Sequence, residues 1–234
     1  GLLIIYKNKF ISQLIENGWH GIAYASVFTI TNIFFVISIE NTNVANTLIM
    51  IALAPMLSAI ISFIFLKENT DQKTWIAISI TTLAVIYIFN DSFEKGDVLG
   101  NFFGLICATG LAVGAVIIRS TKKINLVPSA MMGKLMVALI ALLFADNLVL
   151  KGNDSIIIPL MCIMCVAIPF VLITLAPRYI TAAEVNLFFL LETILGPLWV
   201  WLAIKEQPST ETIIGGIIII ATIATHSVLS LKKT

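Results

Sequence analysis

Glu192 is the residue of this sequence whose type and position are best suited to chemistry. It lies eleven residues into an apolar stretch at about 181–204, and a rise of about 1.5 Å per residue places it near the middle of a bilayer. A charge there costs about 2.5–3.5 kcal/mol on insertion scales. We interpret Glu192 as an ammonium partner for a substrate or as a protonation site. A structural carboxylic acid, bonded to a neighbouring helix, is the alternative.

Two aromatic residues and one lysine join Glu192 as candidates for the wall of a substrate cavity. At about 100° per residue, Phe188 and Trp199 lie on the same face of a continuous helix as Glu192. Lys134 enters the apolar stretch at 129–150 by about five residues, so its ammonium can snorkel to the nearby surface. The alternative for Lys134 is a partnership with a carboxylate in the bundle or with an anionic substrate.

Three asparagines, Asn32, Asn46 and Asn186, also lie inside apolar stretches. Hydrogen bonding between helices is their default role, worth about 0.6 kcal/mol on average, and lining of the cavity is the alternative for each. Glu184 lies about three residues from the edge of its stretch and is expected to reach water at the headgroups.

The composition excludes several classes of function. The 234 residues are 59% apolar and 12% charged, whereas a soluble domain averages about 45–50% apolar and about 25% charged. The net charge of +1 leaves no basic excess for a nucleic acid. The sequence holds no HExxH, GxSxG or P-loop motif, and its two histidines, His20 and His226, are far apart. We therefore expect no metal, no cofactor and no nucleic-acid partner.

Continuous apolar runs of about 20 residues predict an all-α polytopic membrane protein. Eight full transmembrane helices are predicted, with the following approximate bounds: 20–39, 44–66, 74–90, 99–118, 129–150, 156–176, 181–204 and 212–231. The connections between them are short and polar, so the function must lie within the bundle.

The lysines and arginines predict the orientation of the bundle. If the loop before the first full span is cytoplasmic, ten of the 14 cations fall inside and three fall outside, with Lys134 within a span. This bias follows the positive-inside rule and predicts a cytoplasmic C-terminus. The ten inside residues are Lys7, Lys9, Lys67, Lys73, Arg119, Lys122, Lys123, Arg178, Lys232 and Lys233.

A shift of 138 residues aligns the second and third spans with the seventh and eighth without a gap. The dipeptide Lys67-Glu68 meets Lys205-Glu206 and closes the apolar run in both copies. Chance alignment of two apolar helices is the alternative explanation. Because five spans separate the equivalent helices, the copies run in opposite directions, and such inverted repeats are a mark of secondary transporters.

The repeat also predicts the domain organisation. Residues 1–90 form a first repeat with the end of one span and three full spans, and residues 99–231 form a second repeat with five spans. Gly1 aligns with Leu139, in the middle of the fifth full span. We therefore expect that about one and a half spans precede Gly1, and that the whole protein is a ten-helix bundle of two inverted sets of five.

This organisation resembles the drug/metabolite transporter superfamily, in particular its EamA-type members. The helix from Asn43 to Glu68 is similar to the signature helix of the family, with small residues at its start, a central Pro55 and a closing Glu68. The helix from Ala182 to Glu206 is similar, but its proline is displaced to Pro197 and Thr193 occupies the aligned position. The displaced proline predicts that the bend differs between the two halves.

The resemblance implies a transporter of the cytoplasmic (inner) membrane with a substrate cavity between its two halves. We expect a secondary transporter for a small organic metabolite or drug, with an amino-acid-like solute or an amphiphilic cation favoured and proton antiport as one form of coupling. The partners are the solute and the lipid bilayer, and a homodimer is left open. A membrane-embedded enzyme acting on a lipid-linked substrate and a non-transporting membrane subunit are the alternatives.

Overall fold

The fold is known from a computed structural model of the chain. It describes the following residues: 9–42, 44–89, 98–121, 124–145, 152–192, 195, 198–199, 201–202, 205 and 209–231.

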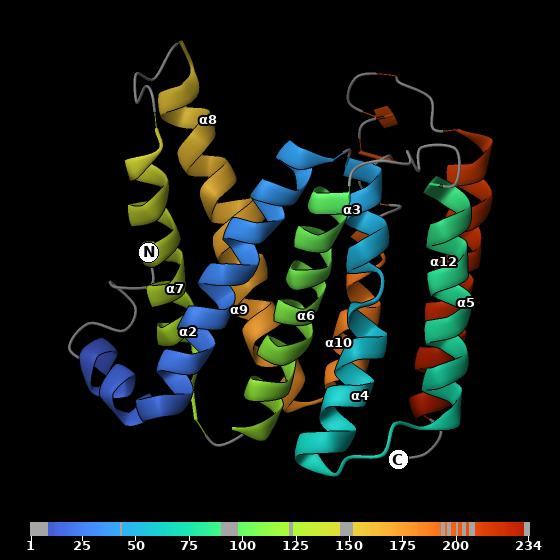
Figure 1. Cartoon of the computed structure of the whole chain (residues 1–234), viewed down its shortest axis with the longest axis horizontal. Coiled ribbons are helices and arrows are strands. Elements are labelled where there is room, and N and C mark those ends of the chain that lie inside the picture. Colours follow the sequence, from blue (N-terminus) through green and yellow to red (C-terminus); the bar gives the residue numbers. More distant parts are fainter. Residues whose placement is uncertain are drawn as a thin grey trace.

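Apolar helices running up and down make up the described part of the chain (Figure 1). The α-helices are α2 (Lys9–Asn41), α3 (Val44–Ile51), α4 (Ala54–Leu66), α5 (Gln72–Phe89), α6 (Val98–Ser120), α7 (Val127–Leu143), α8 (Asp154–Met161), α9 (Ile168–Leu175), α10 (Ala182–Phe189) and α12 (Thr210–Leu231). A π-helical segment, η2 (Cys162–Ala167), joins α8 to α9, and a 3₁₀ turn, η3 (Ala176–Arg178), follows α9.

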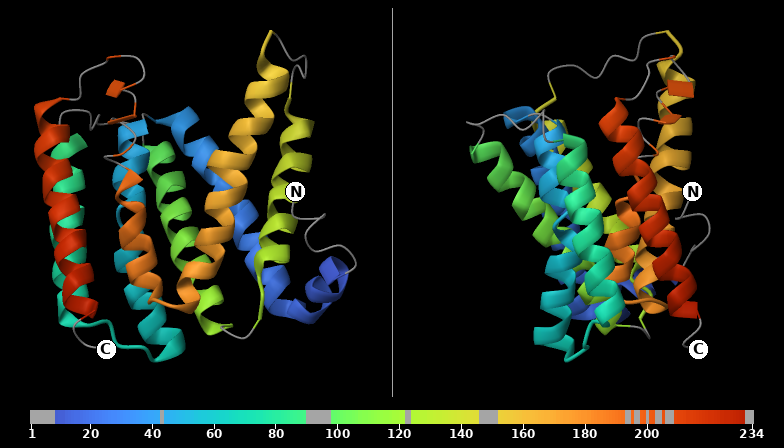
Figure 2. Two further views of the ribbon diagram at one scale, coloured as in Figure 1. Left: turned by 180° about the vertical axis from the view of Figure 1, so that it is seen from behind. Right: turned by 90° about the vertical axis from the view of Figure 1, so that its right-hand side faces the viewer.

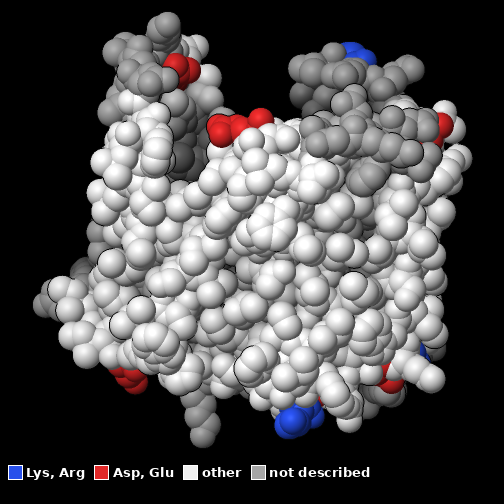
Figure 3. All heavy atoms as spheres, viewed as in Figure 1, with Lys and Arg blue, Asp and Glu red and all other residues white. Residues whose placement is uncertain are grey.

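The elements of the described residues are all helical, which agrees with the predicted polytopic membrane protein. Five described helical segments are long and apolar enough to cross a membrane, and α5 and α7 are shorter apolar helices. Charged atoms on the face shown in Figure 3 lie toward the two ends of the bundle, with uncharged atoms between them. The five segments are Phe10–Asn41, Asn46–Leu66, Val98–Ser120, Asp154–Arg178 and Thr210–Leu229.

The connections from α4 to α5, from α6 to α7 and from α9 to α10 lie at one end of the bundle, together with the end of α12 (Figures 1 and 2). Lys67, Lys73, Arg119 and Arg178 all lie in or beside these connections. We call this end of the bundle the Arg119 end. These four described cations agree with the positive charge that the positive-inside rule expects on a cytoplasmic side.

The first span is confirmed as the long part of α2, which is broken near its start at Gly18. Gly18 has φ 48° and ψ −137°, a conformation that is accessible to glycine and strained for other residues. The turns before Gly18 run at an angle to the rest of α2 (Figure 1).

The second predicted span is two helices that meet in the middle. The first, α3, ends at Ile51, a turn covers Ala52 and Leu53, and α4 begins with Pro55 in its first turn. In the turn, the Leu53 N–H donates to the Met50 carbonyl at 3.1 Å, three residues back instead of four. A proline lacks an N–H and clashes with the preceding turn, which explains why the continuous helix stops here.

The same break occurs 138 residues later. Helix α10 ends at Phe189, and the N–H of Leu191 donates to the carbonyl of Phe188 at 3.1 Å. The displaced proline predicted that the bend would differ between the two halves. The two breaks, at residues 52–53 and 190–191, instead lie at aligned positions. Lys67 and Lys205, also 138 apart, both adopt a positive φ, of 56° and 63°.

Spans related by this offset contact each other and run in opposite directions. Asn186 of α10 donates to Ser58 Oγ of α4 at 2.5 Å, and His226 near the end of α12 contacts Thr74 near the start of α5 at 2.9 Å. These pairs support the inverted repeat. The ten-helix bundle stays a prediction, and the expected remnant of an earlier span at residues 1–8 lies outside the described residues.

Glycines let α6 approach its neighbours closely, as expected for small residues spaced four apart in a membrane helix. A Cβ added to Gly100 would lie 2.7 Å from the backbone carbonyl of Asn41, at the end of α2. A Cβ added to Gly104 would lie 3.0 Å from Met50 Cβ in α3. In contrast, a Cβ at Gly114 would meet only Tyr24 Cε2 at 3.6 Å, an ordinary contact.

We predict that Gly100→Ala destabilises the protein and that Gly114→Ala does not. Both substitutions gain the same intrinsic helix propensity, so only the clash with the Asn41 backbone differs between them. Overpacking of this kind costs about 1–3 kcal/mol, which lowers Tm by about 2–10 °C in a protein of this size. Thermal unfolding of both variants in one detergent measures it. Equal Tm values would contradict the close contact between α6 and α2.

Candidate functional site

A cavity of about 370 Å³ lies inside the bundle, between α2, α6, α7, α9 and α10. Its wall is mostly apolar and aromatic, and its polar side chains are few. The aromatic lining residues are Tyr24, Phe28, Phe35, Phe170 and Phe189, and the polar ones besides Tyr24 include Thr31, Asn32, Lys134 and Glu192. A mainly apolar cavity with a few convergent polar groups is typical of sites that bind small organic ligands.

Lys134 of α7 reaches into this cavity. Its Nζ donates a hydrogen bond to Asn32 Oδ1 at 2.8 Å and lies 3.8 Å from the ring centroid of Phe170 and 5.0 Å from that of Phe28. Aromatic faces stabilise a cation by about 0.5–2 kcal/mol. No ion pair joins Lys134 to an acid of the described residues. The charge is therefore held by an amide and two rings, which leaves N–H donors of the ammonium for a ligand.

A hydrogen bond within α2 orients the side chain of Asn32. Its Nδ2 donates to the Phe28 carbonyl one turn earlier in α2, at 2.7 Å. This bond uses the donor side of the amide and turns the Oδ1 atom toward Lys134. Tyr24, one turn before Phe28, donates its hydroxyl to Thr174 Oγ1 of α9 at 3.3 Å, because the Thr174 hydroxyl itself donates to the Phe170 carbonyl. These bonds fix two neighbouring parts of the cavity wall.

Glu192 also lines the cavity and is exposed. The turn at Leu190 and Leu191 precedes it, so the register of α10 does not continue to Glu192. The same break explains why Phe188 and Trp199 are absent from the lining, since their assignment assumed one continuous helix. Phe188 is 38% exposed and Trp199 is 63% exposed, while the neighbouring Phe189 lines the cavity.

The other two asparagines lie away from the cavity lining. Asn46 is fully buried at the start of α3, where its Nδ2 donates to Thr42 Oγ1 at 2.9 Å. Asn186 is buried between α10 and α4 and donates to Ser58 Oγ and to the Ala182 carbonyl. The structure thus brings Glu192, Asn32 and Lys134 to one cavity and gives Asn46 and Asn186 contacts between and within helices. Their roles in transport stay predictions.

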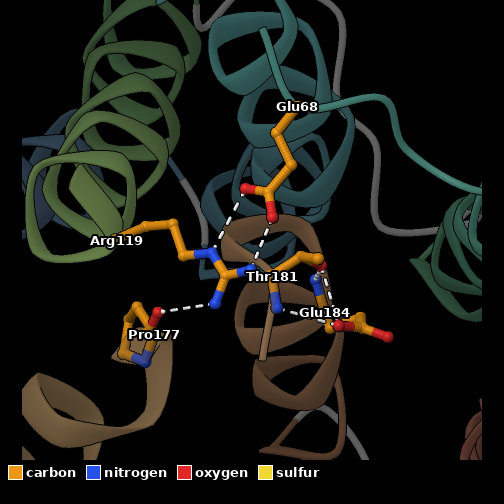
Figure 4. Close-up of polar contacts among 5 residues, drawn as sticks. All are labelled: Glu68, Arg119, Pro177, Thr181 and Glu184. Atoms are coloured by element: carbon orange, nitrogen blue, oxygen red, sulfur yellow. Dashed lines mark hydrogen bonds and ion pairs between the residues drawn. The ribbon is translucent and has the colours of Figure 1, made fainter. Parts of the chain in front are cut away.

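An ion pair lies at the Arg119 end of the bundle (Figure 4). Arg119 of α6 donates through Nη2 to Glu68 Oε1 at 2.5 Å and through Nε to Glu68 Oε2 at 3.2 Å. A guanidinium that meets both carboxylate oxygens forms a strong and well-oriented pair. Arg119 also donates through Nη1 to the Pro177 carbonyl at 3.4 Å. One side chain therefore ties α6 to the end of α4 and to the connection between α9 and α10.

The start of α10 is fixed beside this ion pair (Figure 4). Thr181 caps the helix by accepting from the Glu184 N–H at 3.2 Å, and Glu184 Oε2 accepts from the Thr181 N–H at 2.8 Å. This reciprocal arrangement, a capping box, satisfies two backbone donors at the helix terminus. Arg178, in the same connection, donates to the carbonyl of Ile124. The connection from α9 to α10 is therefore held on both sides.

Glu68 and Arg119 line an outer hollow, and Ile118, next to Arg119, lines the inner cavity. The outer hollow lies at the Arg119 end and is lined by His20, Leu66, Glu68, Arg119, Ser120, Thr121 and Ile124. On the inner side, Ile118 and Pro177 belong to the cavity lining. We infer that the ion pair limits access to the cavity at this end, while its lining reaches the exposed Glu192 and Phe35 toward the other end.

Sequence reasoning did not predict the closure, because Glu68 and Arg119 each lie at the edge of a span, where charged residues are ordinary. A signal was present in the closing glutamate of the helix from Asn43 to Glu68, which the resemblance had already marked. Among the described residues, no group of three or more His, Cys, Asp or Glu is placed to hold a metal ion.

Two stretches of the chain, residues 1–90 and 98–228, match the model of the EamA-like transporter family. The chain belongs to this family. EamA proteins are part of the drug/metabolite transporter superfamily and are membrane transporters rather than enzymes.

A solved crystal structure has a fold similar to that of this chain. That structure is similar to this chain with a TM-score of 0.77 and 17% sequence identity, over 94% of this chain and 83% of the other. At this identity the likeness shows the fold alone. No curated protein shows significant sequence similarity to the chain.

We predict that Arg119→Ala opens the cavity at the Arg119 end. Cys107 lines the cavity and is buried, so its thiol reports entry of water-soluble reagents. With Cys162 and Cys165 replaced by Ser, no other cysteine of this sequence remains. Loss of the ion pair removes about 1–3 kcal/mol, so an impermeant thiol reagent added at the Arg119 end should label Cys107 about tenfold faster.

Ser120→Ala is the matched control for this labelling experiment. Ser120 is exposed and adjacent to Arg119, and its hydroxyl donates to the Ile117 carbonyl within its own helix. Its replacement should leave the labelling rate of Cys107 unchanged. If Arg119→Ala labels no faster than Ser120→Ala, the ion pair does not close the cavity.

Proposed function

We propose that this EamA protein is a secondary transporter for a small organic solute with an apolar body and an amino-acid-like charged end. It moves the solute across the cytoplasmic membrane by alternating access, with protons moving in the opposite direction. The observation that carries the proposal is a mainly apolar cavity that holds one lysine ammonium and one glutamate.

The chemistry of the cavity wall favours a zwitterion. The ammonium of Lys134 has no acid partner among the described residues and suits a carboxylate, since a hydrogen bond to a charged group is worth about 1.5–3 kcal/mol. Glu192 suits an ammonium or a proton. Phe28, Phe35, Phe170 and Phe189 suit an apolar body. A volume of about 370 Å³ is at the small end of ligand cavities.

Closure at one end supports alternating access. The Arg119–Glu68 pair closes the Arg119 end, which the positive-inside rule assigns to the cytoplasm. In this proposal, the cavity of this structure faces away from the cytoplasm. Breaking the pair and closing the other end would expose the same cavity to the cytoplasm, as inverted-repeat transporters do.

An amphiphilic cation is the second candidate substrate, and Glu192 together with the aromatic lining favours it. Lys134 argues against it, because a second cation in a small apolar cavity is repelled. A second copy of the chain, forming a homodimer, is also kept as a proposed partner.

Flux into sealed vesicles tests the function. The solutes are radiolabelled apolar amino acids, their methyl esters and amphiphilic amines, each measured with and without a pH gradient. We expect saturable flux of an amino acid that falls when the gradient is dissipated and that the methyl ester does not inhibit. Flux of amines alone would favour the second candidate. Absence of saturable flux for all solutes, in protein that still unfolds cooperatively, would contradict the proposal.

Two substitutions in the cavity separate the roles of the charges. Lys134→Met keeps the length of the side chain but removes the ammonium, so KM for the transported amino acid should rise about tenfold or more. Glu192→Gln should weaken the dependence of flux on the pH gradient. Lys205→Met, at an exposed lysine that lies outside this cavity, is the control and should change neither. An unchanged KM in Lys134→Met would exclude a carboxylate contact.

A further inference from the structure

His226 is a buried titratable residue that the transport mechanism above does not use. It lies near the end of α12 and is 4% exposed. Its Nε2 is 2.9 Å from Thr74 Oγ1 of α5 and 3.9 Å from Glu184 Oε1 of α10. Three helices therefore meet at one imidazole nitrogen, with a hydroxyl and a carboxylate as its neighbours.

The two oxygens of Glu184 face different partners. Its Oε2 accepts from the backbone and hydroxyl of Thr181 in the capping box, and its Oε1 faces His226. Among the charged groups of the elements around His226, Glu184 comes from α10 and Lys73 from α5. Lys73 and His226 line a hollow of about 300 Å³ between α5 and α12. This hollow gives water a path toward the imidazole.

We propose that His226, paired with Glu184, is a proton-binding site that controls the opening of the Arg119 end. The proposal rests on the proposed function, because this opening is one step of alternating access. Imidazole is the side chain that gains and loses a proton near neutral pH, and it serves in this way in pH-sensitive switches.

Each protonation state has its own partner at Nε2. In the neutral state, Nε2 and Thr74 Oγ1 share one hydrogen bond at 2.9 Å, and Glu184 Oε1 receives no proton from the ring at 3.9 Å. When water supplies a proton, the imidazole becomes a cation beside the carboxylate, and hydroxide or buffer base remains in solution. Attraction between the charges then draws Glu184 toward α12.

Glu184 connects this site to the ion pair at the Arg119 end. It caps α10 through Thr181, and Thr181 follows Pro177 in the connection from α9. The Pro177 carbonyl accepts from Arg119 (Figure 4). A protonated His226 therefore anchors the start of α10 to α12, in the position where Pro177 meets Arg119. Loss of the proton removes this anchor and favours opening.

The direction of the effect follows from linkage. If protonation stabilises the state that is closed at the Arg119 end, that state binds the proton more tightly than the open state. Acidification at the Arg119 end should then lower the labelling of Cys107 from that end. Variants that cannot hold the charge pair should lose this response.

The test uses Cys107 labelling in sealed vesicles with the Arg119 end outward, with Cys162 and Cys165 replaced by Ser. Rates are measured at about pH 5 and about pH 8, where imidazole changes its charge. At each pH the rate is divided by that of His226→Gln, which removes the effect of pH on the thiol reaction itself. We expect the ratio to be near one at the higher pH and to fall about fivefold at the lower pH.

Two further variants make the outcome decisive. Glu184→Gln keeps the capping box, since glutamine serves equally at this position, but removes the charge, so it should behave as His226→Gln does. His20→Gln replaces the other histidine of the sequence, which is exposed and lines the outer hollow. It should keep the full response.

A ratio that does not change with pH would overturn the proposal, and so would loss of the response in His20→Gln alone. Labelling of Cys107 requires no transported solute. A failed proton site and a failed transport function are therefore distinguishable, since vesicles that show saturable flux can lack the response, and the reverse is equally observable.

Discussion

Backbone groups without partners are costly in hydrocarbon, and the interrupted helices of this protein obey that constraint. At each break, at residues 52–53 and 190–191, the chain replaces a four-residue hydrogen bond by a three-residue one of 3.1 Å. In the first break, the hydroxyl of Thr82 in α5 also donates to the Ala52 carbonyl, at 3.4 Å. The breaks lie among packed helices, and because α10 stops at Phe189, both Phe189 and Leu190 line the cavity. The shape of the cavity therefore depends on where the backbone can be interrupted.

The positions of the helices follow from the sequence because apolar runs end at charged residues, as α4 ends just before Lys67. The repeat offset was readable for the same reason. The break before Glu192 could not be predicted, because no proline occupies the position aligned with Pro55. The assignment of Phe188 and Trp199 to the face of Glu192 assumed one continuous helix. The contact of Arg119 with Glu68 joins residues 51 apart, and that of Thr74 with His226 joins residues 152 apart. Sequence spacing shows that such residues lie near a membrane edge but not which of them meet.

Charged side chains inside the bundle are stabilised in three different ways. Lys134 is held by an amide oxygen and two aromatic rings, so its charge stays available to a solute. Arg119 and Glu68 neutralise each other at the Arg119 end of the bundle. Glu184 accepts hydrogen bonds from the backbone and hydroxyl of Thr181 at a helix terminus, and the His226 imidazole lies 3.9 Å from its second oxygen. These arrangements suit three separate tasks, namely solute binding, closure and control of closure.

The break between α3 and α4 has a mechanical consequence. Helix α4 is 13 residues long and carries Glu68 just beyond its far end, so at about 1.5 Å per residue it is a lever of about 20 Å that pivots at the break. A rotation of about 10° at the break moves the far end of α4 by about 3.5 Å, and a displacement of this size is enough to break a hydrogen bond there. A small torsional change at residues 52–53 is therefore enough to separate Glu68 from Arg119, while α3 and the opposite end of the bundle stay in place.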